Sequence, residues 1–443
     1  MKTILTWAMV ALSLCMLCCD NMLAQATDNG LTPSQTKSVI DSIGERLELN
    51  YVFPEVAKAM SAKLKKNEKD GAYAAISDPI EFAEKLTTDL QSVSNDLHLR
   101  VRFDPQQIAQ WDEAVTPADS TRYMNNYIQR LQRDNFGFKK VELLDGNIGY
   151  LDLRSFSDTQ YASETATAAM NFLSNADAII IDLRANGGGS PQMIQLISSY
   201  LFEGRVHLNN FYMRPTDETL QTWTLPYVPG KRNTQADVYV LTSGSTFSAA
   251  EEFSYNLKNL ERATLIGETT GGGAHPGGNQ QVDDRFMIWL PTGRAISPIT
   301  NTNWEGTGVV PHFEVPAADA LETALLKALE KLKNKSDNDE MAFFYEWSIK
   351  GLQAKKNPVK VPSAMLKEYA GNYGPRSVSF EDNQLFYQRG KGRKYTLVPL
   401  GNDEFMLDGL SDFRIQFLSE GNKIIALQGN YQSGNTDLNQ RDR

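Results

Sequence analysis

The chain has 443 residues, of which 41% are hydrophobic and 22% charged, and its formal net charge is −10. This length and composition are typical of an ordinary soluble globular protein with room for two or three domains and at least one large core. No basic tract offsets the acidic charge, so nucleic acid is not an expected partner.

The N-terminus has the features of an export signal. Lys2 precedes an apolar run over residues 4–19, and the small residues that follow, Leu23-Ala24-Gln25-Ala26, suit signal peptidase. We therefore expect residues 1–26 to be removed and the mature protein to be periplasmic or extracellular, without a stable membrane span. An uncleaved anchor and a lipoprotein acylated at Cys18 or Cys19 are the alternatives. All three cysteines precede residue 27, so cleavage would exclude disulfides, a cysteine nucleophile and thiolate metal sites.

Three amphipathic helices are predicted next, over about 33–50, about 53–66 and from Pro79 onward. The third has the sharpest start, because Asp78 can cap it, Pro79 fits the first helical position and Glu81 completes a capping box. These helices predict an N-terminal helical module over residues 27–103.

From Asn147 the pattern changes to short apolar strands that alternate with helices. The predicted strands are 148–153, 178–183 and 238–242, and the predicted helices are 167–173, 191–201 and 247–260. This alternation predicts an α/β fold class with a buried sheet, spanning residues 104–333. A charged, lysine-rich linker is expected over 334–364, and six short strands between 378 and 428 predict a small antiparallel β domain over 365–443.

Ser248 lies where a predicted strand gives way to a helix. Unpaired N–H groups and the positive end of the helix dipole favour a developing oxyanion there, so Ser248 is a candidate nucleophile. Ser248-Ala249-Ala250-Glu251 also fits a capping box, in which serine and glutamate only satisfy orphan amides. Both interpretations are open at this point.

A serine nucleophile needs a base, and the chain has four histidines. His98 lies in Asp96-Leu97-His98-Leu99-Arg100-Val101, where the start of a strand could hold its imidazole; the alternative is a partly buried structural histidine. His275 is close to the serine-bearing helix in sequence but lies among glycines, so geometry could favour either histidine. Glu305 could orient the base, or it could be a solvated loop carboxylate.

The segment Asp182-Leu183-Arg184-Ala185-Asn186-Gly187-Gly188-Gly189 follows a predicted buried strand. Three glycines at such a turn let backbone N–H groups approach a ligand closely, as an oxyanion or phosphate site requires, although a plain flexible turn has the same composition. The lysine of a P-loop and the full dinucleotide fingerprint are missing from it, so a nucleotide is not expected. No histidine or carboxylate cluster has metal-ligand spacing in the sequence, so neither a metal nor a cofactor is implied.

Five motifs in this order resemble those of the C-terminal processing, or tail-specific, serine protease family, particularly the branch with interphotoreceptor retinoid-binding protein modules and Tricorn protease. They are DLHL at 96–99, GNIGYL at 146–151, DLRANGGG at 182–189, TFSAAEE at 246–252 and WEGTGVVP at 304–311. The resemblance covers about residues 31–332 and implies a crotonase-like (ClpP/crotonase) core. It implies Ser248 as nucleophile, His98 as general base and Glu305 in the supporting network. It also implies an oxyanion hole from the amides of Ala249 and Gly188, with Gly189 as the alternative to Gly188.

Three departures from the family pattern affect the expected activity. Gly273 stands where the processing proteases have a dyad lysine, so His98 should be the base. Leu97 stands where Tricorn has a second catalytic serine, so the tetrad is incomplete. Residues 104–138 are too short and too helical for a PDZ-like insert, so small or unfolded peptides are the expected substrates.

The expected function is therefore an exported serine peptidase that hydrolyses peptide bonds through an acyl-enzyme on Ser248. One alternative is a non-catalytic carrier of apolar ligands, such as a retinoid or fatty acid, on the same scaffold. Another is an acyl-thioester enzyme, which export away from coenzyme A disfavours. The sequence does not indicate an oligomeric state.

Overall fold

The computed structural model describes residues 30–112, 117–421 and 423–442, so the predicted signal peptide lies outside the described residues. The fold is mixed α/β, as predicted, and it divides into two compact units. Unit 1 comprises the described part of Met1–Asn126, with Asn209–Gln221 and Gly272–Gly306. Unit 2 comprises Tyr127–Leu208, Thr222–Gly271 and Thr307–Arg443. Among the described residues, no helix combines the length and the apolar character needed to cross a membrane.

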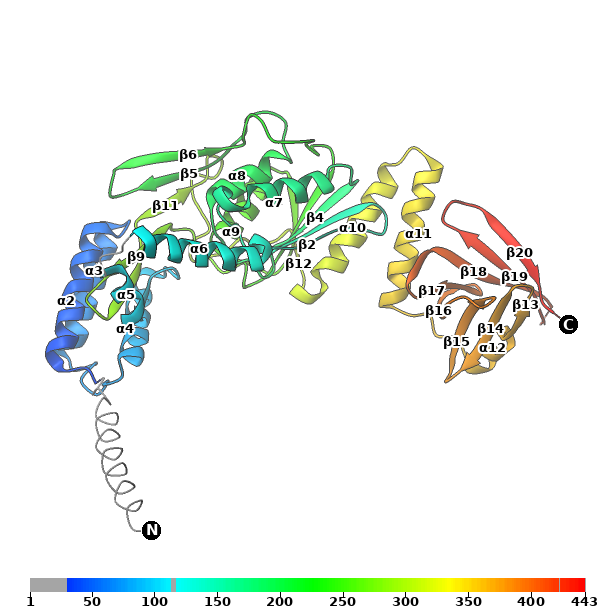
Figure 1. Ribbon diagram of the computed structural model, residues 1–443, viewed down its shortest axis with the longest axis horizontal. Coiled ribbons are helices and arrows are strands. Elements are labelled where there is room, and N and C mark those ends of the chain that lie inside the picture. The colour runs from blue at the N-terminus through cyan, green and yellow to red at the C-terminus, as the bar shows by residue number, and fades with distance from the viewer. Residues whose placement is uncertain (1–29, 113–116, 422, 443) are drawn as a thin grey trace, which may run out of the picture. The chain divides into compact units, whose positions relative to one another are not determined.

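Unit 1 begins with the three predicted helices, α2 (Pro33–Asn50), α3 (Pro54–Lys69) and α4 (Pro79–Ser94) (Figure 1). The expected cap of α4 is present, because the Asp78 carboxylate accepts a hydrogen bond from the Ile80 N–H at 2.7 Å. The buried faces of these helices pack with apolar residues of β1 (Arg100–Phe103) and β10 (Phe286–Pro291). The antiparallel sheet β1-β10-β9, with β9 at Gly277–Gln281, thus joins the helices to a segment almost 200 residues downstream.

A second antiparallel sheet contributes to unit 1. Strand β11 (Gly293–Ile296) pairs with β5 (His207–Met213), which is followed in the sheet by β6 (Glu218–Trp223). The helical module predicted over 27–103 is therefore completed by segments from inside the predicted core. Two further helices, α5 (Pro105–Asp112) and α6 (Pro117–Arg133), follow β1 and agree with the helical character expected there.

Unit 2 is built on a six-stranded sheet in the order β12-β8-β7-β4-β3-β2. Its strands are β2 (Phe138–Leu144), β3 (Ile148–Leu153), β4 (Ala178–Asp182), β7 (Asp237–Thr242), β8 (Ala263–Gly267) and β12 (Phe313–Glu314). Strands β2 and β3 are antiparallel, and the other neighbouring pairs are parallel. The carboxyl ends of β4 and β7 consequently lie side by side, with Asp182 opposite Leu241.

Helices cover both faces of this sheet (Figure 1). Helices α10 (Ala320–Lys335) and α11 (Asp339–Lys356) share one apolar core with alternate strand residues such as Ile180, Leu241 and Ile266. Helices α7 (Thr159–Phe172), α8 (Pro191–Ser199) and α9 (Ala249–Asn259) lie on the other face. Every residue of β3 and β4 is buried, which explains why these strands appear as continuous apolar runs in the sequence.

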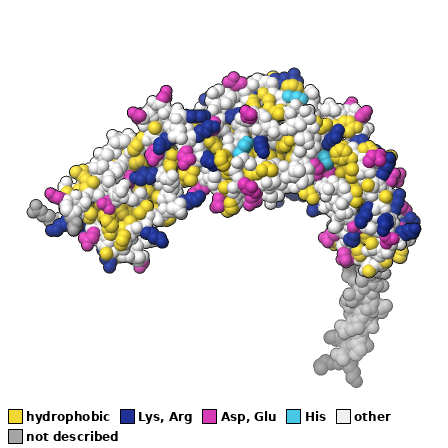
Figure 2. Space-filling view, turned by 180° about the vertical axis from the view of Figure 1, so that it is seen from behind, with side chains coloured by type: hydrophobic (Ala, Val, Ile, Leu, Met, Phe, Trp, Pro, Cys, Tyr) yellow, Lys and Arg dark blue, Asp and Glu magenta, His cyan; other side chains and the backbone are white. Residues whose placement is uncertain are grey.

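The C-terminal part forms an eight-stranded antiparallel sheet that is nearly a barrel, preceded by α12 (Ser363–Tyr369). Neighbours along the chain pair in order: β13 (Gly371–Tyr373), β14 (Arg376–Glu381), β15 (Gln384–Arg389), β16 (Lys394–Gly401), β17 (Glu404–Leu407), β18 (Leu410–Glu420), β19 (Lys423–Tyr431) and β20 (Thr436–Gln440). The six predicted strands correspond to β14 to β19. The predicted linker over 334–364 instead contains the whole of helix α11, whose Trp347 Nε1 donates to the Ser411 carbonyl at 2.6 Å. On the face shown in Figure 2, acidic and basic side chains are interspersed.

Candidate active site

Ser248 lies in unit 2 at the turn between β7 and α9. It is the N-cap residue of α9, with φ 55° and ψ −120°. N-cap residues normally have extended backbone, and a non-glycine residue at positive φ costs on the order of 1–3 kcal/mol. Such strain persists where the surrounding structure fixes a side chain in a particular direction, so this turn is distinguished from an ordinary helix start.

The Glu251 side chain holds the backbone of Ser248. One carboxylate oxygen accepts the Ser248 N–H at 2.8 Å, and the other accepts the Thr270 hydroxyl at 2.6 Å. The Glu251 N–H in turn donates to the Ser248 carbonyl oxygen at 2.9 Å. The capping box that the sequence also fitted is therefore present. The Glu251 carboxylate contacts the backbone of Ser248, so that contact is compatible with a chemical role for the hydroxyl.

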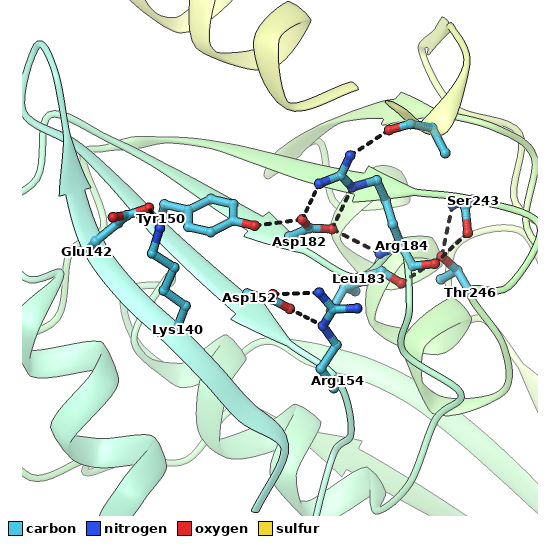
Figure 3. Close-up of polar contacts among 11 residues, drawn as sticks. Lys140, Glu142, Tyr150, Asp152, Arg154, Asp182, Leu183, Arg184, Ser243 and Thr246 are labelled. Carbon is cyan, nitrogen blue, oxygen red and sulfur yellow. Dashed lines mark hydrogen bonds and ion pairs between the residues drawn. The ribbon is translucent and has the colours of Figure 1, made fainter. Parts of the chain in front are cut away.

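The loop before Ser248 is attached to the end of β4 by side-chain hydrogen bonds (Figure 3). Thr246 donates its hydroxyl to the Leu183 carbonyl at 2.8 Å, and Ser243 donates to the Arg184 carbonyl at 2.5 Å. Arg184 in turn donates from Nε and Nη2 to the two carboxylate oxygens of Asp182. Burial alone would raise the pKa of Asp182, but hydrogen bonds, chiefly from Arg184, outweigh burial and lower it. The charged pair thus fixes the end of β4, to which the serine loop is hydrogen-bonded.

Gly188 lies directly against Ser248. Its φ is 111°, and a Cβ atom built on it would come within 2.8 Å of the Ser248 Cβ and 3.0 Å of the Ala249 nitrogen. Glycine is therefore required at this position for both backbone conformation and space. Ala249 is the first residue of α9, so its N–H has no acceptor within the helix and lies at the positive end of the helix dipole.

The Gly188 amide differs from the expectation that it would donate to an oxyanion. It already donates to the Asn186 side-chain oxygen at 2.9 Å, because buried Asn186 folds back over the turn. For Gly189, with φ 139°, the described residues provide no hydrogen-bond acceptor for the N–H. Gly189 and Ala249, the alternative pair named from the sequence, thus have N–H groups without an acceptor among the described residues.

Unit 1 contains a compact cluster of acid and base side chains centred on Asp96, which is fully buried. Its Oδ2 accepts from the Tyr51 hydroxyl at 3.2 Å and lies 2.7 Å from the His275 Nδ1. The edge of the His275 ring packs against Phe53, with ring centroids 5.3 Å apart. Burial and the Asp96 carboxylate raise the pKa of Tyr51 far above its ordinary value, so the phenol remains a hydrogen-bond donor.

His98 belongs to the same cluster and is partly buried. The Asp96 Oδ1 accepts its backbone N–H at 3.1 Å, a local turn that fixes the start of the strand as the sequence suggested. Burial lowers the pKa of His98 to about 4, with Asp96 acting in the opposite direction and His275 in the same direction. His98 is therefore neutral near pH 7, the form that accepts a proton. Leu97, in the position of the missing tetrad serine, is 47% exposed.

Glu305 completes the cluster through the loop that follows Trp304. Its Oε2 accepts the Ala274 N–H at 2.5 Å and lies 3.3 Å from the His275 Nδ1. One ligand atom each from Asp96, His98 and Glu305 lies within 4.8 Å of the others, a geometry that could hold a divalent cation. The sequence did not suggest this set, because Glu305 is about 200 residues from the other two.

The remaining histidines lie in unit 2. His312 Nδ1 accepts the Leu265 N–H at 2.9 Å, and His207 stacks on Trp223 with ring centroids 4.3 Å apart. Both contacts are structural. The cluster in unit 1 thus brings His98 and Glu305 together with His275, which was ambiguous from the sequence, and with Tyr51, which no sequence motif indicated.

Two family models match the chain. Residues 147–315 match peptidase family S41, and residues 20–136 match the N-terminal domain of peptidase S41 in eukaryotic IRBP. The chain belongs to peptidase family S41.

The matching relatives are carboxy-terminal processing proteases. The chain is 26% identical over 210 residues to the carboxy-terminal processing protease CtpA of Bacillus subtilis, covering 46% of this chain and 43% of the relative. It is 31% identical over 127 residues to the carboxyl-terminal-processing protease of Synechocystis, covering 28% of each chain. The chain thus spans less than half the length of these curated relatives.

Solved structures that resemble this chain also have low sequence identity to it. A crystal structure from Parabacteroides merdae, described as a peptidase, is 18% identical, with a TM-score of 0.48 and coverage of 69% of this chain and 98% of that one. The Tricorn protease has a TM-score of 0.41 and 14% identity, covering 72% of this chain and 37% of its own.

Proposed function

We propose that this protein is an exported serine peptidase that hydrolyses peptide bonds through an acyl-enzyme on Ser248. Ser248 belongs to unit 2, and His98 and Glu305 belong to unit 1. Membership of peptidase family S41 supports the reaction class. The proposal extends to a crotonase-like core and to small or unfolded peptides as substrates, as the sequence resemblance implies.

In this mechanism the Ser248 Oγ attacks the scissile carbonyl while His98 takes the hydroxyl proton. The carbonyl oxygen becomes an oxyanion, which the N–H groups of Ala249 and Gly189 stabilise. His98 then gives its proton to the leaving amine as the C–N bond breaks. A water molecule attacks the acyl-enzyme with His98 again as base, and the acid product leaves. Glu305 belongs to the network of charges and hydrogen bonds around the base.

The observation that supports the proposal most strongly is the backbone of Ser248. A serine at φ 55° that begins a helix, with Gly188 packed against it and Ala249 presenting a helix N-terminal amide, has the features of an activated nucleophile at an oxyanion site. Glu251 fixes this conformation from the backbone side. The low pKa of His98 supports the base, because a neutral imidazole is required before the attack.

The test is hydrolysis of an unfolded, fluorescently quenched protein by the wild-type chain and by Ser248→Ala. We expect the variant to lose about three orders of magnitude or more in turnover. Ser245→Ala is the matched control, since Ser245 is an exposed serine of the same loop. Near-wild-type hydrolysis by Ser248→Ala would reject the proposal. A wild-type chain that hydrolyses nothing but binds a fatty acid or retinoid tightly would support the carrier function instead.

A further inference from the structure

A cavity of about 510 Å³ lies within unit 1, beside the acid and base cluster. Its walls include Phe53, Val56 and Ile296, and its polar lining includes His275, Arg294 and Glu305. A cavity of this volume, lined by both apolar and polar side chains, is large enough for a small ligand or for one or two residues of a peptide. Because His275 and Glu305 line both features, the cavity and the cluster are continuous.

Arg294 is the unusual residue of this cavity. It lies on β11 opposite Tyr212 of β5, and its guanidinium carbon lies 5.7 Å from the Tyr212 ring centroid and 5.6 Å from that of Phe53. These two rings hold the side chain from the apolar side. Its Nε atom is buried, and no hydrogen-bond acceptor or ion-pair partner for Arg294 occurs within residues 30–112, 117–421 and 423–442. A permanently charged group with a buried donor and no acceptor costs stability unless a ligand supplies the acceptor.

The nearby acidic groups Glu305 and Asp96 form ion pairs with His275, and neither forms one with Arg294 among the described residues. Glu305 Oε2 accepts the Ala274 N–H and lies close to the His275 Nδ1. Asp96 is bound to Tyr51, His275 and the backbone of His98. The guanidinium of Arg294 is therefore the permanent positive charge that lines the cavity.

We propose that this cavity is a substrate subsite in which Arg294 binds a carboxylate of the peptide. The guanidinium would pair with both carboxylate oxygens, while Phe53, Val56 and Ile296 contact the aliphatic part of the same residue. The carboxylate is either that of a glutamate or aspartate side chain or that of the peptide C-terminus, since both have the same chemistry. The proposal rests on the proposed peptidase function for its substrate class.

The test measures equilibrium binding of labelled peptides to the Ser248→Ala form of the chain, in which chemistry is removed. Three peptides of one sequence are compared: one with a free C-terminus and no acidic side chain, its C-terminal amide, and the amide with one glutamine replaced by glutamate. We expect at least one carboxylate peptide to bind about 10- to 100-fold more tightly than the neutral amide. The first peptide reports the terminal carboxylate and the third reports the side chain.

Adding Arg294→Gln should make the three affinities equal, and Arg294→Lys should retain part of the preference because it keeps the charge but not the bidentate geometry. Arg102→Gln is the matched control, since Arg102 is an exposed arginine of β1 that does not line the cavity, and it should keep the full preference. The proposal would be overturned if the three peptides bound equally to the chain that retains Arg294. It would also be overturned if the preference for a carboxylate peptide survived Arg294→Gln in a folded chain. Hydrolysis by the wild-type chain is measured separately, so failure of the peptidase function and failure of this subsite give different results.

Discussion

Replacing Gly188 by alanine should disable the proposed oxyanion site without removing any catalytic group. The added methyl would lie 3.0 Å from the Ala249 nitrogen and 2.8 Å from the Ser248 Cβ. The 2.8 Å distance is shorter than real Cβ contacts and the 3.0 Å distance is tighter than most of them, and the atoms it meets are backbone or the Cβ of a short side chain, which cannot swing away. The methyl would therefore occupy the space next to the N–H group that we assign to the oxyanion.

The substitution should change two free energies, that of unfolding and that of activation. Alanine at φ 111° carries backbone strain of about 1–3 kcal/mol, which lowers the free energy of unfolding. Loss of one oxyanion donor raises the activation free energy by about 3 kcal/mol, which corresponds to a decrease in kcat of about 10²-fold. The substrate would still bind elsewhere, so we expect a larger effect on kcat than on KM.

The assay compares kcat, KM and the denaturation midpoint of wild type, Gly188→Ala and Gly187→Ala. Gly187 is the adjacent glycine, a Cβ atom on it would meet nothing within 4 Å, and its φ is not in the left-handed region. Gly187→Ala should therefore stay within about 0.5 kcal/mol of wild type in stability. A folded Gly188→Ala that keeps kcat within about threefold of wild type would refute the assignment of this space to the oxyanion.

Three further outcomes are expected. Glu251→Ala should lower the free energy of unfolding by about 3 kcal/mol in chemical denaturation, because it leaves the part-buried Ser248 N–H and the buried Thr270 hydroxyl without their acceptor. The folded-state pKa of His98, about 4, lies below its ordinary value of 6.5, so the unfolded chain binds an extra proton between these values. Stability should therefore fall by about 3 kcal/mol as pH falls from 6.5 to 4, and His98→Asn should lack this component. Dialysis against a chelator should leave hydrolysis unchanged; a loss restored by Zn²⁺ would show that the cluster of Asp96, His98 and Glu305 binds a cation.

Much of the fold could be predicted because its signals are local. The caps of α2 and α4, the buried runs of β3 and β4 and the strands β14 to β19 all follow from neighbouring residues. The composition of unit 1 could not be predicted in this way. Its sheet pairs β1 with β10, and pairing across almost 200 residues depends on the packing of Phe286 and Ile288 against helices, which no local pattern specifies.

The candidate site likewise has features that could be predicted from the sequence and features that could not. Ser248 and Gly188 could be named from the sequence, because a strand-to-helix turn and a glycine run have local signatures. The positive φ of Ser248 and the Asn186 side chain on the Gly188 amide could not, since both depend on the whole turn. His275 stayed ambiguous for a related reason, as its position is fixed by Asp96, 179 residues away in sequence.

Fluorophosphonate labelling of the mature protein, followed by mass spectrometry of the modified peptide, tests the central claim most directly. A parallel His98→Ala sample shows whether the nucleophile depends on the proposed base. We expect a single modification on Ser248 that is lost, or slowed by orders of magnitude, without His98. A folded wild-type protein with no label on Ser248, or a label that is unaffected by His98→Ala, would contradict it.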